Sequence, residues 1–163
     1  MKIVYALFSS LAICGLAAAL EGACAGRNVR SFFASLRFPR YSAPLWVWTI
    51  IGGGYYVIFF FIIYRLFRLN YYSGLWYVAF GLIVFMMIVN ALSNYVIFRA
   101  RNLYLSFIIG AAFPIMDVTL FALLTTLDHA ATLAMVPYLL YRVYAVFWGY
   151  GLWRANQPTG IHK

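Results

Sequence analysis

Long apolar runs separated by short polar stretches make up almost the whole chain. Five such runs cover residues 3–22, 45–64, 75–98, 103–127 and 130–153. A helix needs about 20 mainly apolar residues to cross a membrane, because it rises about 1.5 Å per residue and the hydrocarbon layer is about 30 Å thick. These runs are apolar on every face, whereas the strands of a membrane barrel alternate over about 10 residues. The pattern therefore predicts an all-α membrane protein with five transmembrane helices.

The polar stretches between the runs are connections rather than further domains. They cover residues 24–44, 68–73, 99–102 and 128–129. Turns as short as the last three place consecutive helices side by side and antiparallel. We therefore expect one bundle domain that extends over residues 1–163.

Composition identifies lipid as the solvent of this chain. Hydrophobic residues make up 66% of it and charged residues 9%, whereas an ordinary soluble domain is about a quarter charged. The acidic residues of the chain are Glu21, Asp117 and Asp128. So few charges cannot cover the core of a soluble protein. We therefore expect membrane lipid as a partner along the whole chain.

The first run has a second interpretation. Lys2, the apolar run after it and the small residues Ala23, Cys24 and Ala25 also fit a cleavable signal peptide. The run is long for the apolar region of such a peptide, and Glu21 lies close to the expected cleavage site. These features favour a transmembrane helix, and the signal peptide stays the alternative.

The net charge of +9 is distributed unequally between the two sides of a five-span topology. One side, which holds the first loop, the third loop and the C-terminus, has eight basic residues: Arg27, Arg30, Arg37, Arg40, Arg99, Arg101, Arg154 and Lys163. The opposite side has three: Lys2, Arg65 and Arg68. Because the more basic side faces the cytoplasm, we predict an external N-terminus and a cytoplasmic C-terminus. The bacterial inner membrane is the expected location, and the mitochondrial outer membrane is the alternative. The arginines form no stripe that could follow a phosphate backbone, so nucleic acid is excluded as a partner.

The chain has no recognisable set of catalytic or metal-binding residues. His129 and His162 lie at a turn and in the C-terminal tail, and Cys14 and Cys24 have no metal-ligand spacing. Three glycines at residues 52–54 lie inside an apolar run, so we interpret them as a site of close helix approach or a local bend. We therefore predict no metal, no required cofactor and no catalytic residue.

Polar side chains lie deep in the apolar runs at Asn90, Asn94, Asp117 and Arg142. Such groups are unfavourable in lipid and are expected to face the bundle interior. Asp117 lies ten residues before the end of its run and Arg142 twelve after the start of the next, which places both roughly 15 to 18 Å along antiparallel helices. We hypothesise a buried pair between them. In the alternative, Arg142 extends to the membrane surface and Asp117 bonds a neighbouring helix.

Aromatic residues make up 21% of the chain. Those near the ends of the runs are expected at the membrane–water interface. Tyr56, Tyr138 and Tyr141 lie deeper and are suited to wall a pocket for a flat, largely apolar ligand, with Asn90 or Arg142 at its polar edge. An ordinary packed core is the alternative.

Several motifs together resemble one membrane-protein family. They are SFFASLRFP at residues 31–39, APLWVW at 43–48, FRAR at 98–101, VPYLLY at 136–141 and LWRAN at 152–156. In this order they resemble the TspO/MBR family, the translocator proteins or tryptophan-rich sensory proteins. The resemblance extends over nearly the whole chain, and the PYLL run is its most specific part.

The resemblance implies a five-helix bundle, commonly a homodimer, with an internal pocket that binds porphyrins and, in some members, sterols or synthetic ligands. It also implies that the first loop covers the pocket and that the following residues lie at or near it: Trp46, Asn90, Pro137, Tyr138 and Tyr141. The polar and aromatic patterns add three candidates to this set: Tyr56, Asp117 and Arg142.

Departures from the family pattern bear on catalysis. Where the family has a tryptophan after the PYLL run this chain has Tyr141, and where it has one after the helix-three asparagine this chain has Ser93. Porphyrin breakdown in the family is associated with such tryptophans. We therefore expect a divergent member that acts as a receptor or transporter-like binder of a tetrapyrrole or sterol-like amphiphile. An enzyme that degrades porphyrin and an assembly protein without a small ligand are the alternatives.

Overall fold

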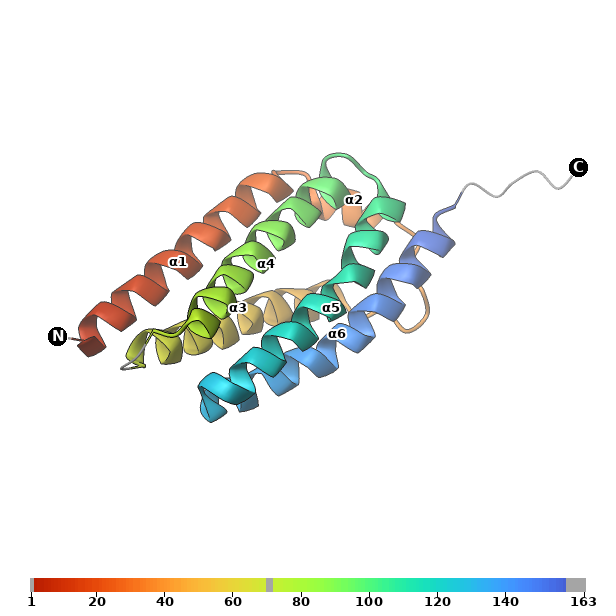
Figure 1. The fold of residues 1–163 in the computed structure, drawn as a ribbon. Coiled ribbons are helices and arrows are strands. Elements are labelled where there is room, and N and C mark those ends of the chain that lie inside the picture. Colours follow the sequence, from red (N-terminus) through yellow and green to blue (C-terminus); the bar gives the residue numbers. More distant parts are fainter. Residues whose placement is uncertain (1, 70–71, 158–163) are drawn as a thin grey trace, which may run out of the picture.

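The computed structural model describes residues 2–69 and 72–157, and within them it consists of helices without strands (Figure 1). Over these residues the helices are α1 (Lys2–Ala25), α2 (Val29–Ser35), α3 (Leu45–Arg68), α4 (Gly74–Phe98), α5 (Leu103–Leu127) and α6 (His129–Ala155). All except α2 are long and apolar enough to cross a membrane. The predicted all-α architecture with five transmembrane helices is confirmed. His162 and Lys163 lie outside the described residues.

Side-chain caps begin three of the long helices. The Ser73 side chain accepts a hydrogen bond from the backbone N–H of Trp76 at the start of α4, and Asn102 accepts one from Leu105 at the start of α5. Asp128 does the same for α6. These caps satisfy backbone N–H groups that the first turn of a helix leaves without partners.

Two elements differ from the hydropathy pattern. α3 ends at Arg68, whereas its apolar run ends at residue 64. Arg65 and Arg68 interrupt the run but not the helix, because cations in the last turn interact favourably with the helix dipole. The short helix α2 was not expected, since its seven residues are too few to show a helical period.

The five long helices form a closed ring. α1 packs against α3 and α4, α3 also packs against α6, and α5 packs between α6 and α4. The start of α1 and the end of α6 lie at opposite ends of this ring (Figure 1). We call the end with α2 and residues 36–44 the α2 end, and the opposite end the N-terminal end.

Apolar side chains fill the ring at the N-terminal end. The fully buried residues there come from α3, α4, α5 and α6: Phe59, Ile62, Ile63, Leu66, Ala79, Ile83, Leu120, Leu124, Ala131 and Met135. The indole N–H of Trp76 donates a hydrogen bond to the carbonyl of Leu66 at 2.9 Å. This half of the bundle is therefore a packed core.

Large apolar side chains also cover the outside of the bundle. Leu16 is 73% exposed, Ile115 72% and Leu140 70%, each on a different helix. Extended apolar surface of this kind is unfavourable in water and favourable in hydrocarbon. The outer surface and the five spans together identify an integral membrane protein.

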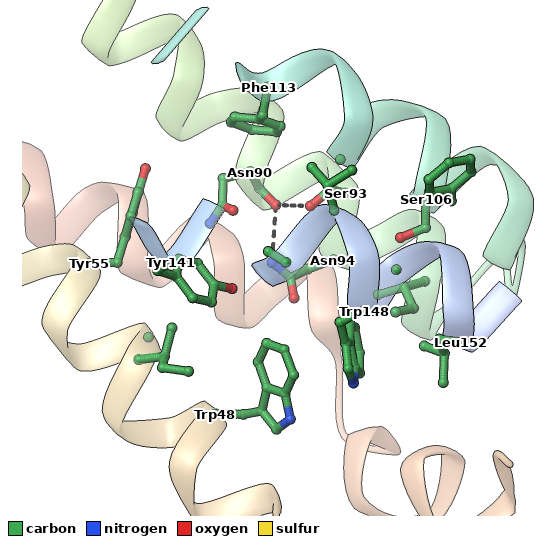
Figure 2. A pocket seen from close by; sticks show the side chains of 18 of the residues that line it. Trp48, Tyr55, Asn90, Ser93, Asn94, Ser106, Phe113, Tyr141, Trp148 and Leu152 are labelled. Atoms are coloured by element: carbon green, nitrogen blue, oxygen red, sulfur yellow. Dashed lines mark hydrogen bonds between the residues drawn. The ribbon is translucent and has the colours of Figure 1, made fainter. Parts of the chain in front are cut away.

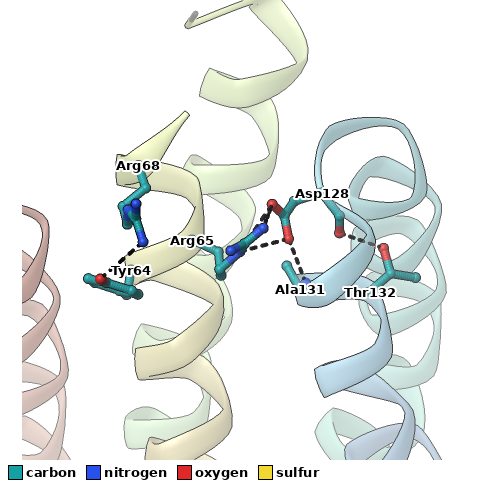
Figure 3. Close-up of polar contacts among 6 residues, drawn as sticks. All are labelled: Tyr64, Arg65, Arg68, Asp128, Ala131 and Thr132. Atoms are coloured by element: carbon teal, nitrogen blue, oxygen red, sulfur yellow. Dashed lines mark hydrogen bonds and ion pairs between the residues drawn. The ribbon is translucent and has the colours of Figure 1, made fainter. Parts of the chain in front are cut away.

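An ion pair joins helices at the N-terminal end (Figure 3). Nε of Arg65 donates to both oxygens of Asp128 at 3.1 Å, and Nη2 donates to Oδ2 at 2.7 Å. Oδ1 also accepts a hydrogen bond from the N–H of Ala131 at 2.8 Å. Burial raises the pKa of the Asp128 carboxyl, but the hydrogen bonds from Arg65 and Ala131 and the charge of Arg65 outweigh it, so this pKa lies below its usual value. One carboxylate therefore binds α3 and caps α6.

Candidate functional site

A cavity of about 370 Å³ lies inside the ring at the α2 end (Figure 2). Its walls come from the first halves of α3 and α5, the second half of α4 and residues 138–152 of α6, and Val29 and Phe33 of α2 border it. α1 contributes Glu21, one turn before its end. Because antiparallel helices bring these halves to the same end of the bundle, residues from all six helices surround one space.

Aromatic rings form much of the cavity wall. The ring centroid of Trp48 on α3 lies 4.3 Å from that of Trp148 and 6.0 Å from that of Tyr144, both on α6. Tyr141 meets Trp48 edge-on at 6.4 Å. Tyr55 also lines the cavity, and among the described residues its buried hydroxyl has no hydrogen-bond partner. Such a wall suits the face of a flat, largely apolar molecule.

The carboxylate of Glu21 lies among neutral hydrogen-bond donors. The hydroxyl of Tyr56 donates to Oε2 at 2.5 Å, and the side-chain amide of Asn90 donates to the same oxygen at 3.1 Å. The amide of Asn94 donates to Oε1 at 3.2 Å and to the backbone carbonyl of Asn90 at 3.0 Å (Figure 2). The cluster joins α1, α3 and α4. Both carboxylate oxygens act as acceptors, which is the role of an ionised carboxylate.

Arg142 of α6 adds a positive charge to the cavity wall. Its Nε donates to Oδ2 of Asp117 at 3.2 Å, and its Nη2 donates to the hydroxyl of Tyr138 at 2.5 Å. The guanidinium carbon lies 4.0 Å from the centroid of the Phe113 ring, a cation–π contact. The side chain of Arg142 is 11% exposed and that of Asp117 1%. The hypothesised Asp117–Arg142 pair is confirmed, and the alternative in which Arg142 extends to the membrane surface is wrong.

The connection that follows α2 is fastened to the end of α6. Oδ1 of Asn156 accepts a hydrogen bond from the backbone N–H of Arg37 at 2.9 Å, and its Nδ2 donates to the carbonyl of Arg37 at 2.8 Å. The indole N–H of Trp148 donates to Oγ of Ser42 at 2.8 Å. These contacts hold residues 36–44 at the same end of the bundle as the cavity.

Comparison with protein-family models gives a match over most of the chain. The model of the TspO/MBR family matches residues 10–154. The chain belongs to the TspO/MBR family. A comparison with curated proteins finds no match. Every residue that lines the cavity lies within the matched region, so the cavity belongs to the part of the chain that defines it as a TspO/MBR protein.

The TspO/MBR bundle brings most of the candidate residues together. Those that line the cavity are Asn90, Tyr138, Tyr141 and Arg142. Tyr56 and Asp117 do not line it but lie directly behind it, because Tyr56 hydrogen-bonds Glu21 and Asp117 pairs with Arg142. The candidate set therefore contains residues that line the cavity and residues that hydrogen-bond or pair with lining residues.

Two of the candidates, Trp46 and Pro137, do not line this cavity. Trp46 is 65% exposed, Pro137 is exposed on the outer face of α6, and neither lines the cavity. A motif fixes the position of a residue along a helix but not the face that turns inward. Two residues along a helix correspond to a rotation of about 200°, so Trp48 faces the cavity while Trp46 faces outward.

Most cavity residues, Glu21 and Trp48 among them, were not in the candidate set. Glu21 lies four residues before the end of α1 and Asn94 four before the end of α4, and both helices end at the α2 end. Equal depth was therefore a signal that could have joined them. Gly52 borders the cavity as well, and no heavy atom lies within 4 Å of a Cβ placed at any of residues 52–54. The expected close helix approach at these glycines is not found.

Metal ligands do not cluster in the part of the chain that the structure describes. No group of three histidine, cysteine or acidic side chains lies close enough there to hold an ion. What the described cavity residues offer is ring stacking, hydrogen bonding and charge.

Proposed function

We propose that this TspO/MBR protein is a receptor or transporter-like protein that binds a tetrapyrrole, or a similar flat amphiphile such as a sterol, in the cavity at the α2 end. One observation carries the proposal: an aromatic wall and a few isolated polar groups surround a single space of about 370 Å³. The rings of Trp48 and Tyr141 offer faces to a flat ligand, while Asn90 or Arg142 meets its polar edge.

The position of the cavity supports ligand capture from one side. Its lining residues come from the α2 half of the bundle, whereas the other half contains packed residues such as Phe59, Ile83 and Leu124. A ligand that enters at the α2 end meets this core as a floor. The arrangement therefore favours a site that holds its ligand, and passage beyond it requires the core to rearrange.

Quenching of tryptophan fluorescence by protoporphyrin in detergent tests the proposal. Trp48 and Trp148 line the cavity, so a bound porphyrin lies close to both rings and quenches their emission. We expect saturable quenching that is smaller in Trp48→Phe than in the native protein. Trp46→Phe is the matched control, because Trp46 lies on the same helix and faces outward. Trp46→Phe lowers the total tryptophan fluorescence, but the fraction of that fluorescence quenched by protoporphyrin is expected to be at least as large as in the native protein.

Other outcomes of this experiment separate the alternatives. Absence of saturable quenching contradicts a tetrapyrrole site and favours an assembly protein without a small ligand. Loss of porphyrin absorbance under illumination, with a new product, identifies an enzyme that degrades its ligand.

We also propose that the α2 end faces the cytoplasm of a bacterial inner membrane and that the protein is a homodimer. The basic residues at the α2 end support this orientation: Arg27, Arg30, Arg37, Arg40, Arg99, Arg101 and Arg154.

A cysteine introduced at exposed His129 is then labelled by an impermeant maleimide from outside intact cells. Labelling only after permeabilisation contradicts the orientation. Chemical cross-linking in membranes tests the dimer.

A further inference from the structure

Glu21 differs from the other acidic residues in its partners. Asp117 pairs with Arg142 and Asp128 pairs with Arg65, whereas the described residues give Glu21 no basic partner within 4.0 Å. The three groups that hydrogen-bond its carboxylate are all neutral. The charge of Glu21 is therefore solvated by dipoles but not neutralised by a cation.

Because Glu21 lies inside the bundle, the lack of a cationic partner among the described residues is unusual. Tyr56, Asn90 and Asn94 direct their donor groups at the two carboxylate oxygens, so Glu21 acts as the acceptor of three hydrogen bonds. Inside a membrane bundle an ionised carboxylate without a counter-charge is unfavourable, and such groups usually pair with a cation. Glu21 is half-buried and borders the cavity, so a molecule in the cavity can reach it.

Arg142 does not supply this counter-charge. Its Nε is directed at Asp117, its Nη2 at Tyr138, and its guanidinium lies over the ring of Phe113. The positive charge on the cavity wall is therefore already balanced by Asp117. With Glu21 ionised, the charged residues that line the cavity, Glu21 and Arg142, together with Asp117 sum to one negative charge.

The aromatic wall is also suited to a cation. Figure 2 shows Trp48 and Tyr141 around the same space as Asn90 and Asn94, the two amides that hold Glu21. A positively charged nitrogen is attracted to the faces of tryptophan and tyrosine rings. The cavity thus combines a carboxylate and ring faces, which are the two features that recognise an alkylammonium group.

We propose that the cavity selects a ligand with a protonated amine or amidinium group and that Glu21 is its counter-charge. This inference rests on the proposed function and adds a preference to it: among ligands with the same flat body, one with a cationic group binds more tightly than a neutral or anionic one. The N–H of the ligand donates to Glu21, and its flat body packs against Trp48 and Tyr141.

Three fluorescent probes with one ring system test the inference: pyrenylmethylamine, pyrenylmethanol and pyrenylacetate. At neutral pH they are cationic, neutral and anionic, and their binding to the native protein in non-ionic detergent is followed by energy transfer from tryptophan. We expect the amine to bind roughly tenfold or more tightly than the alcohol, because hydrogen bonds to charged groups are the stronger ones. The acetate is expected to bind most weakly.

Glu21→Gln assigns the preference to this carboxylate. It is expected to weaken binding of the amine roughly tenfold and to leave binding of the alcohol unchanged. Asp128→Asn is the matched control, because it removes a carboxylate at the N-terminal end, away from the cavity lining. It is expected to change the affinity of none of the three probes.

Each contradicting result has a distinct meaning. Equal affinity of the native protein for the amine and the alcohol overturns the inference and leaves the proposed function standing. Unchanged affinity of folded Glu21→Gln for the amine also overturns it. Absence of saturable binding for all three probes contradicts both the inference and a cavity for flat amphiphiles. The comparison in the native protein does not depend on whether the variant folds.

Discussion

At the scale of single residues, Asp117 and Arg142 show how this chain keeps charge inside a membrane. The two side chains are 3.2 Å apart and almost completely buried. A buried charge loses its hydration, and in an isolated charge no interaction offsets that loss. In the pair, the attraction between Asp117 and Arg142 offsets the desolvation of both groups. Arg142 gains further from the ring of Phe113 and the hydroxyl of Tyr138.

A double-mutant cycle measures this coupling. Arg142→Leu and Asp117→Asn are each expected to lower the free energy of unfolding by about 3–5 kcal/mol, because each removes one member of a buried ion pair. The double variant is expected to lose clearly less than the sum. Unfolding in mixed micelles, followed by loss of helical circular dichroism, gives the four values. Additive losses contradict a coupled pair.

A contact between two side chains could be predicted from the sequence where it depends only on how far each residue lies along its helix. Asp117 and Arg142 could be paired because residues counted from a tight turn give equal depth on antiparallel helices. Sequence reasoning failed where the rotation of a helix decides. Trp46 and Trp48 are both tryptophans in one motif, and only the packing of α3 against its neighbours determines which of them faces the cavity.

At the scale of helices, Asp128 connects elements that are distant in the sequence. Its carboxylate caps α6 and binds Arg65 near the end of α3. The carboxylate is buried, while the Arg65 side chain is 36% exposed at the N-terminal end of the bundle. The contact therefore fixes α3 against the α5–α6 turn at the edge of the packed core.

The lowered pKa of Asp128 makes this contact dependent on pH. Because the pKa is lower in the folded protein than in the unfolded chain, the ionised carboxylate stabilises the fold above its ordinary pKa of about 3.9, and the contribution is lost as the pH falls through the folded value. We expect the native thermal midpoint to exceed that of Asp128→Asn at neutral pH and the difference to shrink below about pH 4. Asparagine retains the helix cap, so the variant isolates the ion pair.

Arg65→Gln provides the partner experiment. This variant removes the same ion pair by changing the basic partner. The difference in thermal midpoint between the native protein and Arg65→Gln is therefore also expected to shrink below about pH 4. A difference between native protein and Asp128→Asn that stays constant from neutral to acidic pH contradicts this role of Asp128.

The long helices could be predicted from the sequence because hydrocarbon thickness fixes their length and the apolar runs match it. The apolar runs do not determine where each helix ends. α3 continues past its apolar run because Arg65 and Arg68 are compatible with the last turn of a helix. Hydropathy carries no signal for α2, whose Phe32 and Phe33 pack against Phe98 at the end of α4, a contact between residues distant in the sequence.

At the scale of the whole molecule, the ring divides into a packed half and a hollow half. The order α1, α3, α6, α5, α4 around the ring is set by helix packing and could not be predicted from the length of the connections alone. That order brings Glu21, Asn90 and Asn94 together and places them beside the aromatic wall. The site is therefore a product of the assembled ring rather than of any one motif.

We propose above that the cavity at the α2 end is where this TspO/MBR protein binds a flat amphiphile. Gly52→Phe fills that space, because Gly52 borders the cavity and no heavy atom lies within 4 Å of a Cβ there. Gly53→Phe is the matched control, since the adjacent Gly53 is exposed on the outside of the same helix.

The most direct measurement is the thermal midpoint of unfolding in detergent with and without protoporphyrin, since a ligand that binds the folded state must raise it. We predict that the ligand raises the midpoint of the native protein and of Gly53→Phe but leaves that of folded Gly52→Phe unchanged. An equal rise in both variants would place the ligand outside the cavity and contradict the claim.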